Sequence, residues 1–267
     1  MPDDFDLRGA SIGNLIITGC FLEHDQDIVS VIYMISKFLG IKGFVRPLTG
    51  ANLHIRTRYS DGREEVGQHL MNKGKDTPPD PNSKIVDIDL VEFLHSADGE
   101  RQESQTCHID IVSSDLVASA DLIVFPMGSY FASILINLLP KGVGRAIANR
   151  KCPKVYIPNT GFDFEMSGYT LVECVQRIIA MIRADHASSG SGRELVNPSV
   201  PSAKDILNFV LIDTVHCEYA VEIDKAAIVD LGVVVIDVPL VEDPESIVKS
   251  KRLDPTKVAE ILISLAS

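Results

Sequence analysis

The first 112 residues combine helical spacing of apolar positions with short stretches in which apolar and polar residues alternate. The apolar spacing predicts two helices at the start, one capped by Ser11 and one beginning at Asp27. Residues 43–112 then alternate in several runs, and Asp61-Gly62 is typical of a two-residue hairpin turn. We therefore expect a small antiparallel β-rich insertion over 43–112. Its predicted strands are 53–59, 65–70, 85–94 and 108–112.

The rest of the chain alternates short continuous apolar runs with helical stretches. Runs of Val, Ile and Leu are typical of strands buried on both faces, and alternation with helices indicates parallel crossovers. The predicted fold class is α/β: a three-layer, doubly wound, mostly parallel Rossmann-like sheet, with residues 1–267 as a single domain. Residues 186–203, rich in Ser, Gly and Pro, are predicted to be a mobile loop. The predicted strands are 121–125, 154–157, 209–212 and 233–236, and the predicted helices are 130–139, 143–150, 171–183, 225–231 and a last helix capped by Asp254.

Composition and charge narrow the range of partners. The 267 residues include 25 Lys and Arg against 37 Asp and Glu, which gives a net charge of −12. A nucleic-acid partner requires a clustered basic face, so this balance argues against one. No apolar run approaches the roughly 20 residues that span a bilayer, so we expect no membrane segment.

The cysteines and the first residues indicate the compartment. The five cysteines are an odd number without a Cys-x-x-Cys pair, which favours free thiols over a disulfide framework. Residues 1–6 are acidic and lack the basic and apolar regions of a signal peptide. We therefore expect a cytoplasmic protein.

Open α/β sheets bind ligands beyond the carboxyl ends of their strands, and this rule selects three loops. After the first parallel strand, Gly128 permits a tight turn and Ser129 can cap the next helix, with Ser133 one turn later. The amides at that helix start would then point at an anion such as phosphate. The alternative is a plain strand-to-helix turn with a serine cap.

The other two loops carry Asn159 and Asp213. Asn159 offers both donors and an acceptor to a ligand, but it can equally close its own turn. Asp213 can hold a ribose, a base or a metal ion, or it can cap the next helix. Near the start of the chain, Gly13 allows close backbone approach, and Asn14 beside it is either a ligand contact or an ordinary first-turn residue.

Three segments in this order resemble one protein family. They are SIGNL at 11–15 before an apolar helix, ADLIV at 120–124 leading into Gly128-Ser129, and PKVY at 153–156 followed by Asn159 and GYT at 168–170. Together they resemble the 2-phospho-L-lactate transferase family, which also includes the gluconeogenesis factors. The stretches ANLH at 51–54 and VGQH at 66–69 are closer to a less characterised bacterial branch of it.

The resemblance implies one of two functions. The transferases move a phospholactyl-type group from a guanosine diphosphate adduct to a deazaflavin with Mg²⁺, and the gluconeogenesis factors bind UDP-sugars and act in regulation. In both, the loop that resembles Gly128-Ser129 helps to hold phosphate. Arg252 lies where the UDP-sugar branch carries an Arg, so the resemblance implies a phosphate clamp there. The alternative for Arg252 is a solvated residue just before a helix cap.

Two departures from the family pattern shape the expectation. The family's first strand, Gly-rich turn and metal-holding acidic pair have no counterpart, so we expect a truncated chain with only the C-terminal two thirds of the family fold. Pro126-Met127 stands where the family has Gly-Pro, and proline removes one amide donor.

The chain is therefore expected to bind a nucleotide diphosphate adduct or a nucleotide sugar at the carboxyl ends of its parallel strands. The Mg²⁺ ligands are expected to be missing, so this chain alone would be incomplete for catalysis. An unpartnered sheet edge and the apolar residues Leu15, Ile16 and Phe21 favour a homo-oligomer or a complementary N-terminal half as partner.

Overall fold

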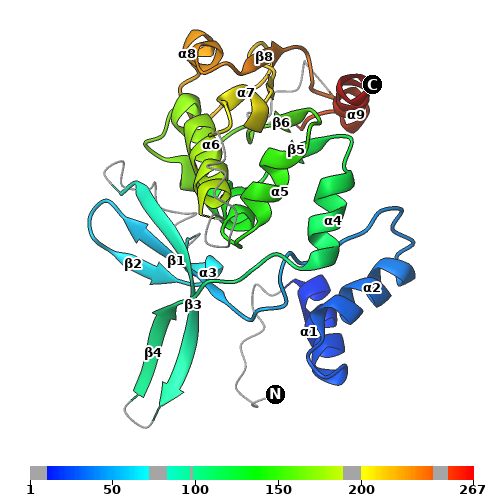
Figure 1. Cartoon of the computed structure of the whole chain (residues 1–267), viewed down its shortest axis with the longest axis vertical. Helices are drawn as coiled ribbons and strands as arrows, with labels where there is room; N and C mark the ends of the chain where they lie inside the picture. Colours follow the sequence, from blue (N-terminus) through cyan, green and yellow to red (C-terminus); the bar gives the residue numbers. More distant parts are fainter. Residues whose placement is uncertain (1–10, 72–82, 97–98, 189–199, 243–251) are drawn as a thin grey trace. The chain divides into compact units, whose positions relative to one another are not determined.

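The computed structural model describes residues 11–71, 83–96, 99–188, 200–242 and 252–267 (Figure 1). These residues divide into two compact units, Met1–Gly50 and Ala51–Ser267. None of the helices in the described ranges has the length and apolar character needed to cross a bilayer.

The first unit contains two helices, as the apolar spacing predicts. They are α1 (Ile12–Glu23) and α2 (Ile28–Phe38). Asp27 caps α2, and its carboxylate accepts hydrogen bonds from two backbone N–H groups of the first turn. Ser11 occupies the N-cap position of α1, but its side chain makes no capping hydrogen bond.

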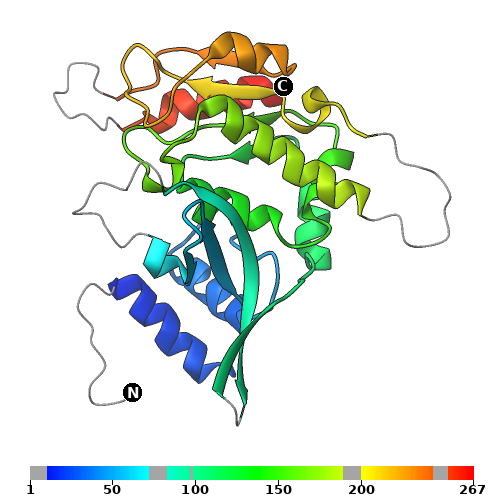
Figure 2. The same cartoon turned by 90° about the vertical axis from the view of Figure 1, so that its left-hand side faces the viewer.

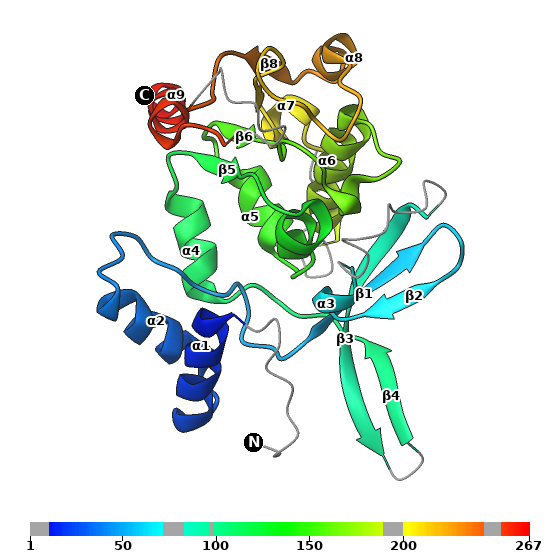
Figure 3. The same cartoon turned by 180° about the vertical axis from the view of Figure 1, so that it is seen from behind.

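The second unit begins with a four-stranded antiparallel sheet in the order β2-β1-β3-β4 (Figure 3). A hairpin turn at Asp61-Gly62 is confirmed, but four residues rather than two separate β1 from β2, and of the pair only Gly62 has a positive φ, 85°. This sheet is separate from the parallel sheet rather than inserted into it. Its strands are β1 (His54–Tyr59), β2 (Glu64–Val66), β3 (Ile85–Ser96) and β4 (Gly99–Ser104).

Two predictions for this part of the chain are wrong in detail. The strand predicted over 65–70 ends at Val66 and continues as the short helix α3 (Gln68–Met71). The strand predicted over 108–112 is instead the start of helix α4 (Ile111–Ser119). The reason is Asp110, whose carboxylate accepts from the backbone N–H of the first turn and so starts a helix in the middle of the apolar run.

The parallel sheet is confirmed, and its four strands follow one another in chain order. Every neighbouring pair is parallel, so each connection runs back along the sheet and all four strands start at the same end of it. Its strands are short: β5 (Ile123–Phe125), β6 (Lys154–Tyr156), β7 (Phe209–Ile212) and β8 (Val234–Asp237).

Helices cover both faces of this sheet, which gives the predicted three layers. On one face, Val155 and Leu211 pack in a core cluster with Val258 of helix α9 (Pro255–Ala266). Tyr156 points to the other face, and its ring centroid lies 6.4 Å from that of Tyr130. Figures 1 and 3 show the strands between α9 and helix α6 (Leu171–Ala187).

The helices that connect the strands largely agree with the sequence pattern. The exception is 130–139, which forms a π-helical turn and then a 3₁₀ turn instead of one α-helix. Of the predicted mobile loop, residues 189–199 lie outside the described residues. The elements are η1 (Tyr130–Ile134), η2 (Leu135–Leu138), α5 (Val143–Asn149), η3 (Phe164–Met166), α7 (Ala203–Ile206) and α8 (Lys225–Asp230).

Polar contacts join the antiparallel sheet to the start of α6, toward which the curved strand β3 rises in Figure 2. Lys84 Nζ lies 2.9 Å from a carboxylate oxygen of Glu173 and 3.8 Å from the ring centroid of Tyr169. The Tyr169 hydroxyl donates to the carbonyl of Ile85. The antiparallel sheet is therefore linked to the parallel sheet through α6 and through Tyr169, which lies two residues before the start of α6.

Candidate functional site

A cavity of about 640 Å³ lies at the carboxyl ends of β5 and β6. Three segments that are far apart in the sequence meet in its wall: the loop after β5, the loop after β6 and the start of α9. The lining residues are Met127, Asn159, Thr160, Arg252, Leu253, Pro255, Val258, Ala259 and Leu262. The structure thus brings Asn159 and Arg252, both candidates from the sequence, to one cavity.

Arg252 and Asn159 give this cavity its donors. Arg252 is exposed, and no carboxylate in the described part of the chain forms an ion pair with its guanidinium. The side-chain nitrogen of Asn159 donates to Asp163 Oδ2 at 3.2 Å. The contact fixes the orientation of the Asn159 amide beside the cavity. An uncommitted guanidinium and an oriented amide are the groups that recognise phosphate and sugar oxygens in proteins.

Gly128 and Ser129 follow Met127, which lines the cavity. Both are half-buried, and no described residue accepts a hydrogen bond from either backbone N–H. A Cβ atom at position 128 would lie 3.2 Å from the Cβ of Ser133, so the loop packs against the first turn of η1. Ser133 therefore supports the loop from behind, and its own side chain is exposed.

The start of η1 differs from the prediction, because its amides are already occupied. The backbone N–H of Tyr130 donates to Asp163 Oδ2 at 3.3 Å. Those of Phe131 and Ala132 both donate to Glu165 Oε2, at 2.7 and 2.8 Å. The helix start does hold anions, but they are the protein's own carboxylates. For an external phosphate, only the amides of Gly128 and Ser129 remain in this loop.

Asp163 and Glu165 were missed by the sequence reasoning. Both are buried, with 8% and 1% of their surfaces exposed, and no described cation pairs with either. Burial, assisted by the nearby charge of Asp163, raises the pKa of Glu165 to about 7. Burial also raises the pKa of Asp163. The available signal was two acids within the otherwise apolar stretch at 162–166.

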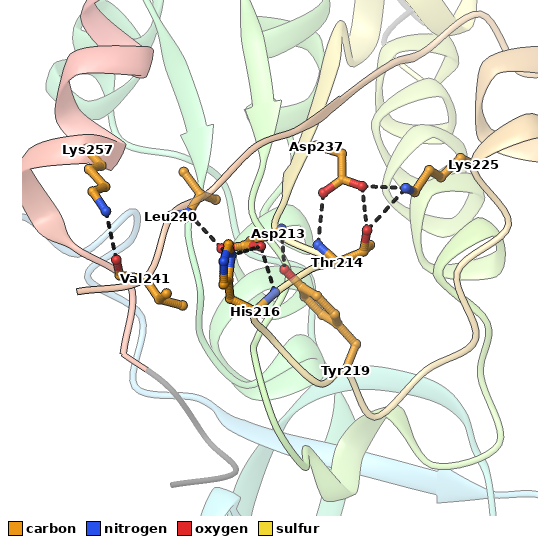
Figure 4. Close-up of polar contacts among 9 residues, drawn as sticks. All are labelled: Asp213, Thr214, His216, Tyr219, Lys225, Asp237, Leu240, Val241 and Lys257. Atoms are coloured by element: carbon orange, nitrogen blue, oxygen red, sulfur yellow. Dashed lines mark hydrogen bonds and ion pairs between the residues drawn. The ribbon is translucent and has the colours of Figure 1, made fainter. Parts of the chain in front are cut away.

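Asp213, at the carboxyl end of β7, is fully buried and holds neighbouring loops together (Figure 4). Its carboxylate accepts from the backbone N–H of Leu240 at 2.7 Å and from that of His216 at 3.0 Å. The His216 ring nitrogen Nδ1 lies 3.0 Å from Oδ1. Burial opposes ionisation, but these hydrogen bonds outweigh it and lower the pKa of Asp213. These contacts of the carboxylate are all with residues of the neighbouring loops, which indicates a role in loop structure.

Figure 4 also shows a second polar group at the same edge of the sheet. Asp237 ends β8 and accepts from both the backbone N–H and the hydroxyl of Thr214. Lys225 pairs with the same carboxylate. The Tyr219 hydroxyl accepts from the backbone N–H of Asp213 at 2.9 Å. The carboxyl ends of β7 and β8 are thus closed by internal contacts, whereas the cavity lies beside β5 and β6.

The other candidates are placed less directly. Gly13 and Asn14 lie in the first turn of α1, in the first unit, and both are exposed. Their participation in a site stays a prediction. Among the described residues, no three His, Cys, Asp or Glu side chains come together as ligands for a metal ion. Whether the chain holds Mg²⁺ together with a bound phosphate stays a prediction.

The fold and the cavity place the chain among α/β proteins with a pocket at the carboxyl edge of a parallel sheet. The sequence profile described as 2-phospho-L-lactate transferase CofD matches residues 1–241. The chain therefore belongs to this family.

Curated relatives carry the second name that the resemblance suggested. A gluconeogenesis factor from Halalkalibacterium halodurans is 27% identical over 264 residues, which are 96% of this chain and 70% of the relative. One from Listeria monocytogenes is 32% identical over 157 residues, which are 58% of this chain and 42% of the relative. The chain spans about half the length of matching relatives from Nostoc sp. and Thermotoga maritima, 50% and 48%.

A solved structure confirms the fold class. The crystal structure of a UPF0052 family member from Bacillus halodurans superposes with a TM-score of 0.68 at 23% sequence identity. The match covers 96% of this chain and 73% of that chain. At this identity the likeness concerns the fold.

Proposed function

We propose that this chain binds a nucleoside diphosphate adduct in the cavity beside β5, β6 and α9, as a phospholactate-transferase-like protein. The observation that carries the proposal is the convergence of Arg252, Asn159 and Met127, which directly precedes Gly128, on one 640 Å³ space. This volume lies in the range of small-molecule sites. The family membership of the chain supports the same class of ligand.

The wall of the cavity divides into a polar and an apolar part. Arg252 supplies a planar guanidinium that can contact two phosphate oxygens, and the free amides of Gly128 and Ser129 can contact a third. Pro255, Val258 and Leu262 on α9 supply an apolar surface for a sugar or base face. We assign the phosphates to the Arg252 side of the cavity for this reason.

A second candidate is regulatory binding of a UDP-sugar without transfer. The curated relatives named gluconeogenesis factor favour it. It uses the same cavity and the same phosphate contacts, so for this chain the two candidates differ in the nucleobase that is bound. In both cases we propose a cytoplasmic protein that self-associates or takes a complementary partner. None of the five cysteines, all of which lie in the described ranges, forms a disulfide, and this agrees with a reducing compartment.

Calorimetry with GDP and with UDP-glucose tests the proposal. Replacing Arg252 by Ala removes one charge-assisted contact, so binding should weaken by about 1.5–3 kcal/mol, roughly 10- to 100-fold in Kd. Lys204→Ala is the matched control, because it removes an exposed cation that does not line this cavity. Equal affinity of wild type and Arg252→Ala for both ligands would contradict the assignment.

An activity assay tests whether this chain is incomplete for catalysis, as we propose. We expect no transfer of a phospholactyl group from a guanosine diphosphate adduct to a deazaflavin by this chain alone, with Mg²⁺ present. The physical reason is that the described residues contain no cluster of metal-binding side chains near the cavity. Measurable turnover would refute the non-catalytic candidate and establish the transferase.

A further inference from the structure

A second cavity, of about 440 Å³, lies between α4 and α5. Figures 1 and 3 show the two helices side by side. The cavity shares no lining residue with the one beside α9, and it reaches residues 150–151, which precede β6. It therefore lies toward the amino end of β6, whereas the first cavity lies at its carboxyl end.

Three cations line this second cavity: Arg145, Arg150 and Lys151. Ser114 and Asn149 add further hydrogen-bond donors, and no Asp or Glu is among the lining residues. Over the whole chain acids outnumber bases by 37 to 25, so a lining of three bases without an acid is contrary to the overall composition. Such a concentration of positive charge attracts anions.

The side chain of Arg150 is held in place. Its Nε donates to the carbonyl of Ala120 at 2.5 Å, which fixes the plane of the guanidinium. Its Nη2 lies 3.5 Å from a carboxylate oxygen of Asp121, but the side chain of Asp121 is 89% exposed. An exposed pair of this length is weak, so it leaves most of the charge of Arg150 available. Arg145 and Lys151 are exposed and form no ion pair with a described carboxylate.

Lys154 reduces the electrostatic repulsion that an anion would meet at the end of α5. The carbonyl groups at the end of a helix carry partial negative charge, which would repel an anion from the end of α5. Lys154 is 2% exposed, and its Nζ donates to the carbonyls of Arg150 at 2.7 Å and Cys152 at 3.2 Å. It also donates to the carbonyl of Asp205 at 2.9 Å. The ammonium thus offsets the carbonyl at the C-cap of α5 from the side of the protein interior.

The start of α5 is likewise accounted for. Asp185 accepts hydrogen bonds from the backbone N–H groups of Gly142 and Arg145, so its carboxylate interacts with the N-terminal amides of that helix. The side chain of Arg145 remains available to the cavity. The carboxylate of Asp185 therefore bonds to the start of α5, and the three cations line the cavity separately from it.

We propose that the α4–α5 cavity binds a small phosphorylated metabolite with two adjacent phosphoryl groups. Guanidinium groups contact phosphate oxygens in pairs, and Lys151 supplies a point charge for a second phosphoryl group. A volume of about 440 Å³ suits a compact polyanion. The inference does not rest on the function proposed for the other cavity.

Calorimetric titration with inorganic pyrophosphate at physiological salt tests the proposal. We expect one site per chain, with Arg145→Gln and Lys151→Gln each weakening binding by about tenfold or more. Lys204→Gln is the matched control, because Lys204 is exposed and lies outside both cavities. Thermal unfolding of each variant verifies that it folds.

Arg252→Gln distinguishes the two cavities. Pyrophosphate binding that survives in Arg252→Gln and weakens in Arg145→Gln supports the proposal, whatever the outcome of the nucleotide titrations. Binding that weakens only in Arg252→Gln, or no binding to the wild type, overturns it. Binding of a single-stranded oligonucleotide at Arg145 and Lys151 without binding of pyrophosphate also overturns it, since a polymer would then be the ligand.

Discussion

Replacing Glu165 by Gln should change how the stability of this protein depends on pH. Glu165 is 1% exposed, and its Oε2 accepts from the amides of Phe131 and Ala132. Its other oxygen, Oε1, has no partner among the described residues. Glutamine retains an acceptor for the two amides and carries no charge, so it resembles the protonated form of Glu165.

The expected magnitude follows from the pKa shift. Glu165 has an ordinary pKa of 4.5, and burial raises it to about 7 in the folded chain. At about 1.4 kcal/mol per pKa unit, ionisation in the folded state costs about 3 kcal/mol. Protonated Glu165 avoids this cost. Because the pKa of Glu165 is raised in the folded chain, the corresponding free energy of unfolding is fully present below pH 4.5, falls as the pH rises, and is lost above about pH 7.

The comparison is therefore between variant and wild type at several pH values. Urea unfolding at pH 5, 6, 7 and 8 should show similar stability at pH 5, and Glu165→Gln more stable by up to about 3 kcal/mol at pH 8. Glu260→Gln is the control: it removes the same charge from an exposed position on α9 and should leave the pH profile unchanged. A constant difference between Glu165→Gln and wild type across this range would refute the reasoning.

Further predictions concern packing and buried charge. Gly144→Ala should destabilise the chain by about 1–3 kcal/mol in urea unfolding, because the new Cβ would lie 2.8 Å from the backbone carbonyl oxygen of Ile182. Gly19→Ala, in α1 with no atom within 4 Å of the new Cβ, should be neutral or slightly stabilising. Lys154→Met should cost about 1–3 kcal/mol in the same assay, since three carbonyls lose their donor. An unchanged midpoint for Gly144→Ala or Lys154→Met would contradict these contacts.

The parallel half of the fold was predictable because its signals are local. The strands that end at Phe125 and Ile212 are apolar throughout, and the one that ends at Tyr156 is apolar after Lys154, as expected for strands covered on both faces. Asp254 and Pro255 mark the start of α9 within two residues, and the structure confirms both the cap and the first position. Strands and helix starts of this kind can be predicted from the local sequence without any knowledge of distant contacts.

The start of α4 shows where such reading fails. Residues 108–112 have a β-like apolar pattern, but Asp110 supplies a helix cap, and the cap decides the structure. A capping side chain is equally local, so this error came from giving the pattern priority over the cap. The 130–139 segment differs for another reason: its first amides bond to side chains about 33 residues away, which no local pattern reports.

That long-range contact also changes how the candidate site works. A helix start with free amides would attract phosphate by itself, and the sequence favoured this arrangement at Ser129. In the structure, Asp163 and Glu165 accept hydrogen bonds from those amides, so the amides are not available to a phosphate. The attraction for a phosphate must then come from elsewhere. Arg252 is the charged group that lines the cavity, and this is why the proposed binding depends on a residue more than a hundred positions from the loop that resembles the family's phosphate loop.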